Sequence, residues 1–342
     1  MEKQKLVTLC IPHYNNKVTI RDTLDSLLGQ TYENILIKVF DNVSTDGSFE
    51  ILKEYEKKHI NIQVFQNSTN IGGEANFTKC IENLEGKYGA IFHADDVYSK
   101  NIVKKQVSFL EKYSNCSAVA THAYIIDENS NSTGYRPIPQ EYEEEEFNVI
   151  GNQLSLLQSV VKNGNFITCP SVMARVDIYR EKVKFWNGEQ FQTSADLDVW
   201  MRLALYGDFG FISIPLMSYR ESLVSYSYKD MRKRITENNM FLVIDFYMQK
   251  YKNVVTKLDK DRYDFLLFKD NLNRTINEVV QGIKGDLELP IFKMSIIKIA
   301  FSSKSNFKIY LVSLFFKILR NFTISKNLQD KIFYYRFRGQ KK

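Results

Sequence analysis

Residues 35–58, ILIKVFDNVSTDGSFEILKEYEKK, carry the clearest indication of the fold class. It begins with an apolar run that ends at Asp41, which is typical of a buried strand. A polar turn follows, and residues 44–47 (STDG) are of the types that favour the start of a helix. Residues 48–58 are therefore predicted to be a helix, and strand, turn and helix in this order form part of a parallel βαβ unit.

The same alternation continues on both sides of this stretch. We predict further strands at residues 6–12, 62–66, 88–93, 118–126, 168–175 and 210–219, and further helices at 17–30, 73–84, 153–162 and 196–206. The polar stretch 127–148 is predicted to be a loop. The pattern predicts an α/β fold with a Rossmann-like, mostly parallel mixed sheet flanked by helices.

The 342 residues are enough for one large α/β domain and an appendage. From residue 229 onward the apolar pattern is helical, without convincing strand alternation. We place the boundary within residues 222–230. The predicted organisation is a domain of residues 1–225 and a helical C-terminal region of residues 226–342.

The net charge of +6 is unevenly spread along the chain. Residues 291–342 contain nine Lys and three Arg against one Asp, a net +11, which leaves about −5 for residues 1–290. This asymmetry indicates that one end of the molecule meets an anionic surface. There is no basic–aromatic groove motif, so nucleic acid is not expected as the partner.

The cysteines and the N-terminus indicate a cytoplasmic protein. The four cysteines form no CxxC or Cys/His cluster, which argues against a disulfide framework or a zinc site. The first residues, MEKQK, run straight into a predicted strand without the pattern of a signal peptide.

Residues 291–319 are rich in Ile, Phe and Leu but are interrupted by lysines. Their longest uncharged run after Lys308 is residues 309–316, far short of the ~20 residues that span a bilayer. A helix with Lys on one side and apolar residues on the other fits a membrane surface. The alternative is a helix that packs on the protein core with its lysines in water. Through residues 291–342 we therefore expect the chain to meet a membrane peripherally.

Three polar loops follow predicted parallel strands, at residues 12–16, 41–46 and 93–96. Ligands of such sheets lie beyond the carboxyl ends of the strands, so these loops predict a pocket. Asp95 and Asp96 directly follow a buried strand, where a pair of carboxylates is costly unless a cation neutralises it. Mg²⁺ or Mn²⁺ with diphosphate oxygens would do so. The alternative is that these acids favour the start of the next helix.

Five segments together resemble the family 2 glycosyltransferases of the GT-A type. They are Pro12-His13-Tyr14-Asn15, the run DNVSTDG at 41–47, the set Asn70, Gly72 and Asn76, the run HADD at 93–96, and TSADLDVWMRLALYGDF at 193–209. Residues 229–342 lie outside this resemblance. It implies a nucleotide-sugar-binding fold and a transferase that moves a sugar with inversion of configuration in a single displacement.

The resemblance also implies site residues. Asp41 would contact the base of the nucleotide, Asp95 would coordinate the metal, and Asp196 would deprotonate the acceptor hydroxyl as general base. The residues expected to bind nucleotide are Pro12, Tyr14, Asn15, Asp41, Asn70, Asn76, His93 and Asp95. Further candidates are Asp96, Asp198, Arg202 and Arg220.

The implied reaction needs Mn²⁺ or Mg²⁺ and a nucleotide-sugar donor, with UDP-sugar as the expected type. Its acceptor would be a glycan or a lipid-linked sugar in bacterial surface-polysaccharide synthesis, which places the chain at the inner face of the cell membrane. A glycoside hydrolase, which needs paired acids flanking a sugar, would leave the nucleotide-site loops unexplained.

This sequence departs from the family pattern at four positions. His93 replaces the first Asp of the metal motif, Ala195 stands where relatives often have Glu, and Ser222 stands where relatives often have His. Val43 replaces a Gly, which predicts an ordinary backbone φ at that residue. A rival hypothesis follows from the first three departures: a degenerate transferase that retains nucleotide or glycan binding as a scaffold.

Overall fold

A computed structural model describes residues 4–221, 233–283, 285, 287–322 and 325–338. The chain divides into two compact units, one of residues 1–156 with 166–220 and the other of residues 157–165 with 221–342. The predicted boundary at 222–230 lies outside the described residues. Residues 157–165, which the sequence placed with the first domain, group with the second unit.

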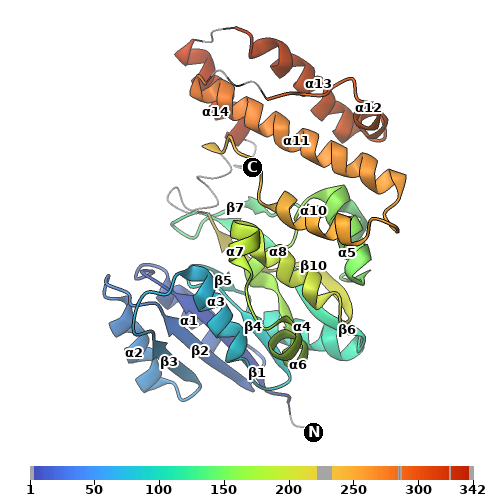
Figure 1. Cartoon of the computed structure of the whole chain (residues 1–342). Coiled ribbons are helices and arrows are strands. Elements are labelled where there is room, and N and C mark those ends of the chain that lie inside the picture. Colours follow the sequence, from blue (N-terminus) through green and yellow to red (C-terminus); the bar gives the residue numbers. More distant parts are fainter. Residues whose placement is uncertain (1–3, 222–232, 284, 286, 323–324, 339–342) are drawn as a thin grey trace. The chain divides into compact units, whose positions relative to one another are not determined.

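The described residues of the first unit form a ten-stranded mixed sheet, which confirms the predicted fold class (Figure 1). Its strand order is β3-β2-β1-β4-β9-β6-β10-β5, while β7 pairs with β6 and β8 pairs with β10. The strands are β1 (Val7–His13), β2 (Ile35–Asp41), β3 (Ile62–Gln66), β4 (Tyr88–Ile91), β5 (Val97–Tyr98), β6 (Cys116–Ile126), β7 (Ser132–Tyr135), β8 (Phe147–Gly151), β9 (Met173–Arg175) and β10 (Asp208–Arg220).

Helices connect and cover these strands. The α-helices are α1 (Ile20–Leu28), α2 (Ser48–Lys58), α3 (Gly73–Glu82), α4 (Ile102–Lys112), α5 (Gln153–Asn163), α6 (Val176–Ile178), α7 (Gly188–Phe191) and α8 (Ala195–Leu203). Short turns of 3₁₀-helix lie at Gln140–Tyr142, Cys169–Ser171 and Gln192–Ser194, and a π-helical turn lies at Tyr179–Val183.

Strands β2, β1 and β4 are parallel neighbours, so their carboxyl ends lie along one edge of the sheet. Every residue of β4 and nearly every residue of β1 is buried, because helices cover both faces of the sheet. That double burial is why these strands read as continuous apolar runs rather than as alternating ones.

The polar stretch 127–148 differs from the prediction of a loop. It holds the edge strand β7 and the first residues of β8. Strand β7 is short, accessible and mostly polar, so its sequence lacks the apolar alternation by which a strand is recognised, and β8, with the sequence FNVIG, is too short to show it.

The second unit consists of helices in its described part, as predicted. They are most of α5, together with α10 (Met240–Lys250), α11 (Lys257–Gln281), α12 (Met294–Ala300), α13 (Lys304–Leu319) and α14 (Lys326–Arg338). Thr256 and Asp259 form a capping box at the start of α11, and Gly282 ends that helix in the left-handed conformation. The core of this unit is built from α11, α12 and α13 around Phe268 and Ile296.

The apolar segment 291–319 is not one helix. It is broken at residues 301–303, where the Ser303 hydroxyl accepts from the backbone N–H of Asn306 and starts α13. In the described part of the chain, no helix combines the length and the apolar character needed to cross a bilayer.

Candidate active site

Asp41 ends β2 and is fully buried. Its Oδ1 accepts from Nδ1 of His13 at 2.8 Å and from the hydroxyl of Ser44 at 2.5 Å. Its Oδ2 accepts from the backbone N–H of Ser44 at 3.1 Å and from the Gln66 amide at 2.9 Å. Burial by itself would raise the pKa of Asp41, but these hydrogen bonds outweigh it and lower the pKa to about 2. Because a carboxylate has about four acceptor positions, a base N–H would have to replace one of the four partners.

The loops that follow β1 and β2 hold each other by short hydrogen bonds. The backbone N–H of Asn15 donates to the hydroxyl of Ser44 at 2.9 Å, and the side-chain carbonyl of Asn15 accepts from the N–H of Thr45 at 2.8 Å. Asn15 has a φ of 52°. The adjacent Tyr14 is exposed, and Pro12 is partly buried. The predicted base-binding segment is thus an outward-facing turn clamped to the next loop.

Val43 corrects the prediction of an ordinary backbone conformation. Its φ is 64°, in the left-handed region that a glycine adopts at no steric cost. A β-branched residue rarely takes this conformation, and the cost is of order 1–3 kcal/mol. Asp41 and Ser44, on either side of Val43, bind each other, and this closed turn holds the strained φ in place.

Asn70 and Asn76 belong to a network of amides beside this turn. The Asn42 amide donates to the side chain of Asn70 at 2.7 Å, and that of Asn67 donates to the side chain of Asn76 at 3.1 Å. The Asn76 amide also donates to the backbone carbonyl of Phe40 at 2.8 Å. Asn76 is buried and Asn70 is exposed. Asn42 and Asn67 did not stand out in the sequence, where an isolated Asn after a strand is common turn chemistry.

His93, Asp95 and Asp96 follow β4 and come together. Each offers one ligand atom within 4.8 Å of the others, and His93 Nδ1 lies 3.9 Å from Asp96 Oδ2. Two polar atoms, His93 Nε2 and Asp96 Oδ2, are buried and make no hydrogen bond with the residues that the structure describes. Such atoms are costly. Imidazole nitrogen with carboxylate oxygens is a donor set that a divalent cation accepts, so these residues fit a metal ion.

The pKa shifts of His93 and Asp96 also fit a bound cation. Burial, and after it the negative charge of Asp95, raises the pKa of Asp96 well above its ordinary value. Burial lowers the pKa of His93. In both residues, burial disfavours the charged form of the side chain. A bound cation would lower the pKa of Asp96 again, because it would stabilise the carboxylate.

Arg220 is the last residue of β10 and is nearly fully buried. Its backbone N–H donates to Asp96 Oδ1 at 2.8 Å, and its guanidinium donates to the backbone carbonyl of Asp95 at 2.7 Å. The same guanidinium donates to the carbonyl of Asp127 and to the hydroxyl of Ser130. Arg220 therefore ties the carboxylate loop to the loop after β6. Ser222 lies outside the described residues.

Asp196, in the first turn of α8, is partly buried and accepts a 2.7 Å hydrogen bond from the backbone N–H of Leu197. Burial raises its pKa to about 6, against the opposing effects of that hydrogen bond and of Arg136. Cys169 lies within electrostatic reach of both Asp196 and Asp96, whose charges, after burial, raise the pKa of its thiol.

Asp198 and Arg202 are engaged with each other. The Arg202 Nε donates to Asp198 Oδ2 at 2.8 Å, and Asp198 is buried. The remaining nitrogens of Arg202 donate to the backbone carbonyls of Val183 at 2.6 Å and Phe185 at 2.7 Å. The pair thus fastens α8 to the segment before α7. Asp196, in the same helix, is the acid whose pKa is raised.

Aromatic rings line one side of the carboxylate group. The ring of Phe77 meets His93 edge-on, with 5.6 Å between centroids. The ring of Trp186 stacks on that of Phe77, with 4.4 Å between the centroids. The backbone N–H of Trp186 also donates to the hydroxyl of Thr78 at 3.0 Å, which binds its loop to α3. The sequence did not reveal this wall, because its rings lie 109 positions apart along the chain.

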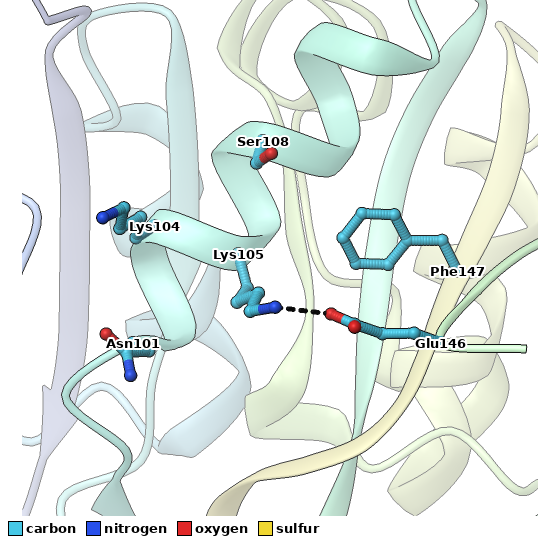
Figure 2. Close-up of a pocket in the computed structure, with 6 residues that line it drawn as sticks. All are labelled: Asn101, Lys104, Lys105, Ser108, Glu146 and Phe147. Carbon is cyan, nitrogen blue, oxygen red and sulfur yellow. Dashed lines mark hydrogen bonds and ion pairs between the residues drawn. The ribbon is translucent and has the colours of Figure 1, made fainter.

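A surface cavity of about 510 Å³ lies elsewhere in the first unit and contains none of the predicted site residues. Figure 2 shows Lys104, Lys105 and Ser108 from α4 and Asn101 just before it, with Glu146 and Phe147 on the other side. Lys105 pairs with Glu146 at 2.7 Å across it. Since its one acid is neutralised by a lysine, this cavity does not offer the carboxylates that the predicted chemistry needs.

Known proteins resemble this chain in both sequence and fold. Residues 8–181 match the family described as glycosyl transferase family 2. The putative glycosyltransferase EpsE of Bacillus subtilis is 27% identical over 57% of this chain and 66% of its own length. The putative teichuronic acid biosynthesis glycosyltransferase TuaG of Bacillus subtilis is 27% identical over 59% of this chain and 73% of its own.

Solved structures share the fold at low sequence identity. Residues 1–349 of TarS from S. aureus, in complex with UDP-GlcNAc, superpose with a TM-score of 0.55 at 15% identity, over 91% of each chain. The mannosyltransferase PcManGT from Pyrobaculum calidifontis, in complex with GDP-Man and Mn²⁺, superposes with a TM-score of 0.53 at 14% identity, over 96% of this chain and 89% of its own. The family match covers half of the chain and includes β1, β2 and the carboxylate loop, so the chain belongs to glycosyl transferase family 2 and is a glycosyltransferase with the GT-A fold.

Proposed function

We propose that this glycosyltransferase is metal-dependent and inverting, and that it moves a sugar from a UDP-sugar to a hydroxyl group of a glycan or lipid-linked acceptor. The observation that carries the proposal is the arrangement at one edge of the sheet. There the loops after β1 and β2 are hydrogen-bonded to each other, and the loop after β4 follows the strand that pairs with β1. A nucleotide site and a cation site would thus be contiguous, and Asp196 and Asp96 both raise the pKa of Cys169.

The cation would be held by His93, Asp95 and Asp96, with Asp95 as the ligand that the family resemblance favours. Mn²⁺ or Mg²⁺ bound there neutralises negative charge on the diphosphate leaving group. The buried Asp96 Oδ2 and His93 Nε2, which lack hydrogen-bond partners in the described chain, support this assignment. Arg220 positions the loop through the Asp95 carbonyl and Asp96 Oδ1, so it acts on the ligands rather than on the donor.

The nucleotide would lie over the turns after β1 and β2. Exposed Tyr14 is suited to stack on the base, and Pro12 and Asn15 shape the turn that carries it. Asp41 would accept a base N–H by exchanging one of its present partners. Asn70 and Asn76 keep the neighbouring loop in register through their amide network. TarS was solved with a UDP-sugar, which supports UDP as the donor nucleotide here.

Asp196 would act as the general base. A carboxylate whose pKa is about 6 is largely ionised at neutral pH and more basic than an ordinary aspartate, which suits removal of a hydroxyl proton as the bond to the anomeric carbon forms. A single displacement with one base and no covalent intermediate inverts the configuration at that carbon. Asp198 is occupied by Arg202, so it is the weaker candidate for this role.

The acceptor is proposed from the relatives. TuaG carries teichuronic acid biosynthesis in its name, which supports a role in bacterial surface-polysaccharide synthesis. Such a role would place the chain on the cytoplasmic side of the cell membrane, where a lipid-linked acceptor is presented at the membrane surface.

The test is a screen of nucleotide-sugars with Mn²⁺ or Mg²⁺, read by release of nucleoside diphosphate. We expect release from a UDP-sugar that stops on chelation, and loss of roughly 10²–10⁴-fold of the turnover in Asp196→Asn with donor affinity unchanged. Asp177→Asn, an exposed aspartate of the same unit, is the control. Full activity in Asp196→Asn would refute the base, and nucleotide binding without turnover of any donor would favour a scaffold.

A further inference from the structure

The outward face of α13 is apolar over most of its length. Leu311, Val312, Phe315, Ile318 and Phe322, which we call the apolar row, are all exposed, from 42% at Val312 to 65% at Phe322. Leu311, Phe315, Ile318 and Phe322 follow one another in steps of three or four residues, which places them on one face of the helix and its continuation, and Val312 lies beside that line. On an ordinary surface helix this face carries polar residues.

The opposite face of α13 already has its partner. Ser313 and Phe316 are buried, and Phe316 belongs to the core that α11 and α12 form with α13. The apolar row is therefore not part of an unfinished core of this unit. Large contiguous apolar patches on soluble proteins mark surfaces that another molecule or a membrane covers.

Helix α12, which packs against α13, and the residues that flank it add further exposed apolar side chains. Met294 in α12, together with Phe292 before it and Phe301 after it, is more than half exposed, while Ile296 and Ile299 fill the core. The exposed apolar surface of this helical pair thus extends beyond a single stripe.

The charges beside the apolar row select among possible partners. Lys304 and Lys308 lie on the same exposed face, about two turns and one turn before Leu311 respectively, and neither forms an ion pair with any described residue. By contrast, Lys293 and Lys298 pair with Asp264 and Asp261. Because residues 291–342 carry a net +11, two copies of this face would repel each other, whereas an anionic surface would attract it.

The length of α13 excludes a transmembrane span and favours binding at the membrane surface. Its 16 residues are fewer than the ~20 that a span requires, and three lysines interrupt them. A helix of this kind lies in the plane of the interface, with apolar side chains among the acyl chains and cations beside the headgroups.

We propose that the apolar row of α13, with Lys304 and Lys308, docks this protein on an anionic lipid membrane. The lysines precede the row at the start of the helix, which corrects the expectation of lysines on the face opposite to the apolar residues. Docking requires neither donor nor metal, so its test is independent of the proposed transfer reaction.

The full chain is sedimented with vesicles of phosphatidylcholine alone or with a third of phosphatidylglycerol. We expect binding to the anionic vesicles, weakening with added salt, and little binding to the neutral ones. Lys304→Glu with Lys308→Glu should lower the affinity roughly twentyfold or more. Phe315→Glu with Ile318→Glu should lower it roughly a hundredfold, because it removes two apolar anchors and adds repulsion.

Ile60→Glu is the matched control, because Ile60 is a fully exposed apolar residue of the other unit, and it should bind as the unchanged chain does. Thermal melting checks that each variant is folded, and sedimentation equilibrium reports the oligomeric state. The proposal is overturned if the unchanged chain ignores anionic vesicles, or if Ile60→Glu loses as much binding as the row variants. It is also overturned if the row variants dissociate an oligomer while vesicle binding is absent.

Discussion

The backbone N–H of Arg220 donates a 2.8 Å hydrogen bond to Oδ1 of Asp96, across 124 positions of sequence. Parallel pairing of β10 with β6, together with the antiparallel contact between β10 and β5, brings the end of β10 to the loop after β4. The Arg220 side chain then binds the Asp95 carbonyl. The carboxylate loop is consequently held from the distal half of the domain as well as by the strand that precedes it.

The rate of sugar transfer should depend on pH through Asp196. Because burial raises the pKa of this group to about 6, the base is ionised above that pH and becomes protonated below it. We expect kcat to be level above about pH 7 and to fall about tenfold for each pH unit well below 6. Rates of nucleoside diphosphate release at constant ionic strength measure this profile. An acid limb near pH 4, the ordinary range of an aspartate, would contradict the assignment.

The choice of metal should depend on His93. Imidazole binds Mn²⁺ better than Mg²⁺, which prefers oxygen, so the unchanged chain should favour Mn²⁺. His93→Asp should raise the affinity for Mg²⁺ relative to Mn²⁺ by roughly tenfold, because it supplies a third carboxylate. Titration calorimetry of both cations in the presence of UDP gives the two affinities.

His59→Asp is the control for that experiment, since His59 lies outside the carboxylate group. Asp96→Asn should weaken both cations by at least roughly tenfold, given that the buried Asp96 Oδ2 is available to them. Unchanged cation binding in both Asp95→Asn and Asp96→Asn would show that these residues do not hold the cation.

The stability of the first unit should fall in acid because of Asp41. Its pKa is about 2 in the folded protein and 3.8 ordinarily, so the folded state gains stability when the group is ionised. That contribution, about 2 kcal/mol, is present above about pH 4 and is lost as the pH falls toward 2. Urea unfolding between pH 5 and pH 3 should show the loss, and Asp41→Asn should flatten it. An equal slope in Asp41→Asn would contradict the prediction.

Val43→Gly should stabilise the protein. Glycine takes the φ of 64° without strain, which relieves roughly 1–3 kcal/mol, while its greater freedom in the unfolded chain costs about 0.4–1 kcal/mol. The expected gain in the free energy of unfolding is about 1 kcal/mol, measured by urea denaturation. Val18→Gly, at an exposed valine with no positive φ, should instead lower stability slightly. A loss in Val43→Gly equal to that in Val18→Gly would show that the turn is not strained.

Local pattern located three elements of the first unit correctly. Strands β2 and β3 and helix α2 begin and end where the sequence predicted. Strand β7 was missed because its residues are accessible and mostly polar, and β8, with the sequence FNVIG, was missed because it is too short to show an alternating pattern. The conformation of Val43 was predicted wrongly, since side-chain preference was outweighed by the hydrogen bonds of the surrounding turn.

Near neighbours in the chain are enough to establish the alternation of strand and helix, the polar loops at the strand ends and the family resemblance. The packing of distant segments was needed to show that His13 binds Asp41, that Arg220 binds Asp96, and that Asp196 has a raised pKa. It also decided that the apolar row of α13 faces outward. Burial and hydrogen-bond partners are set by residues distant in sequence, so no local pattern encodes them.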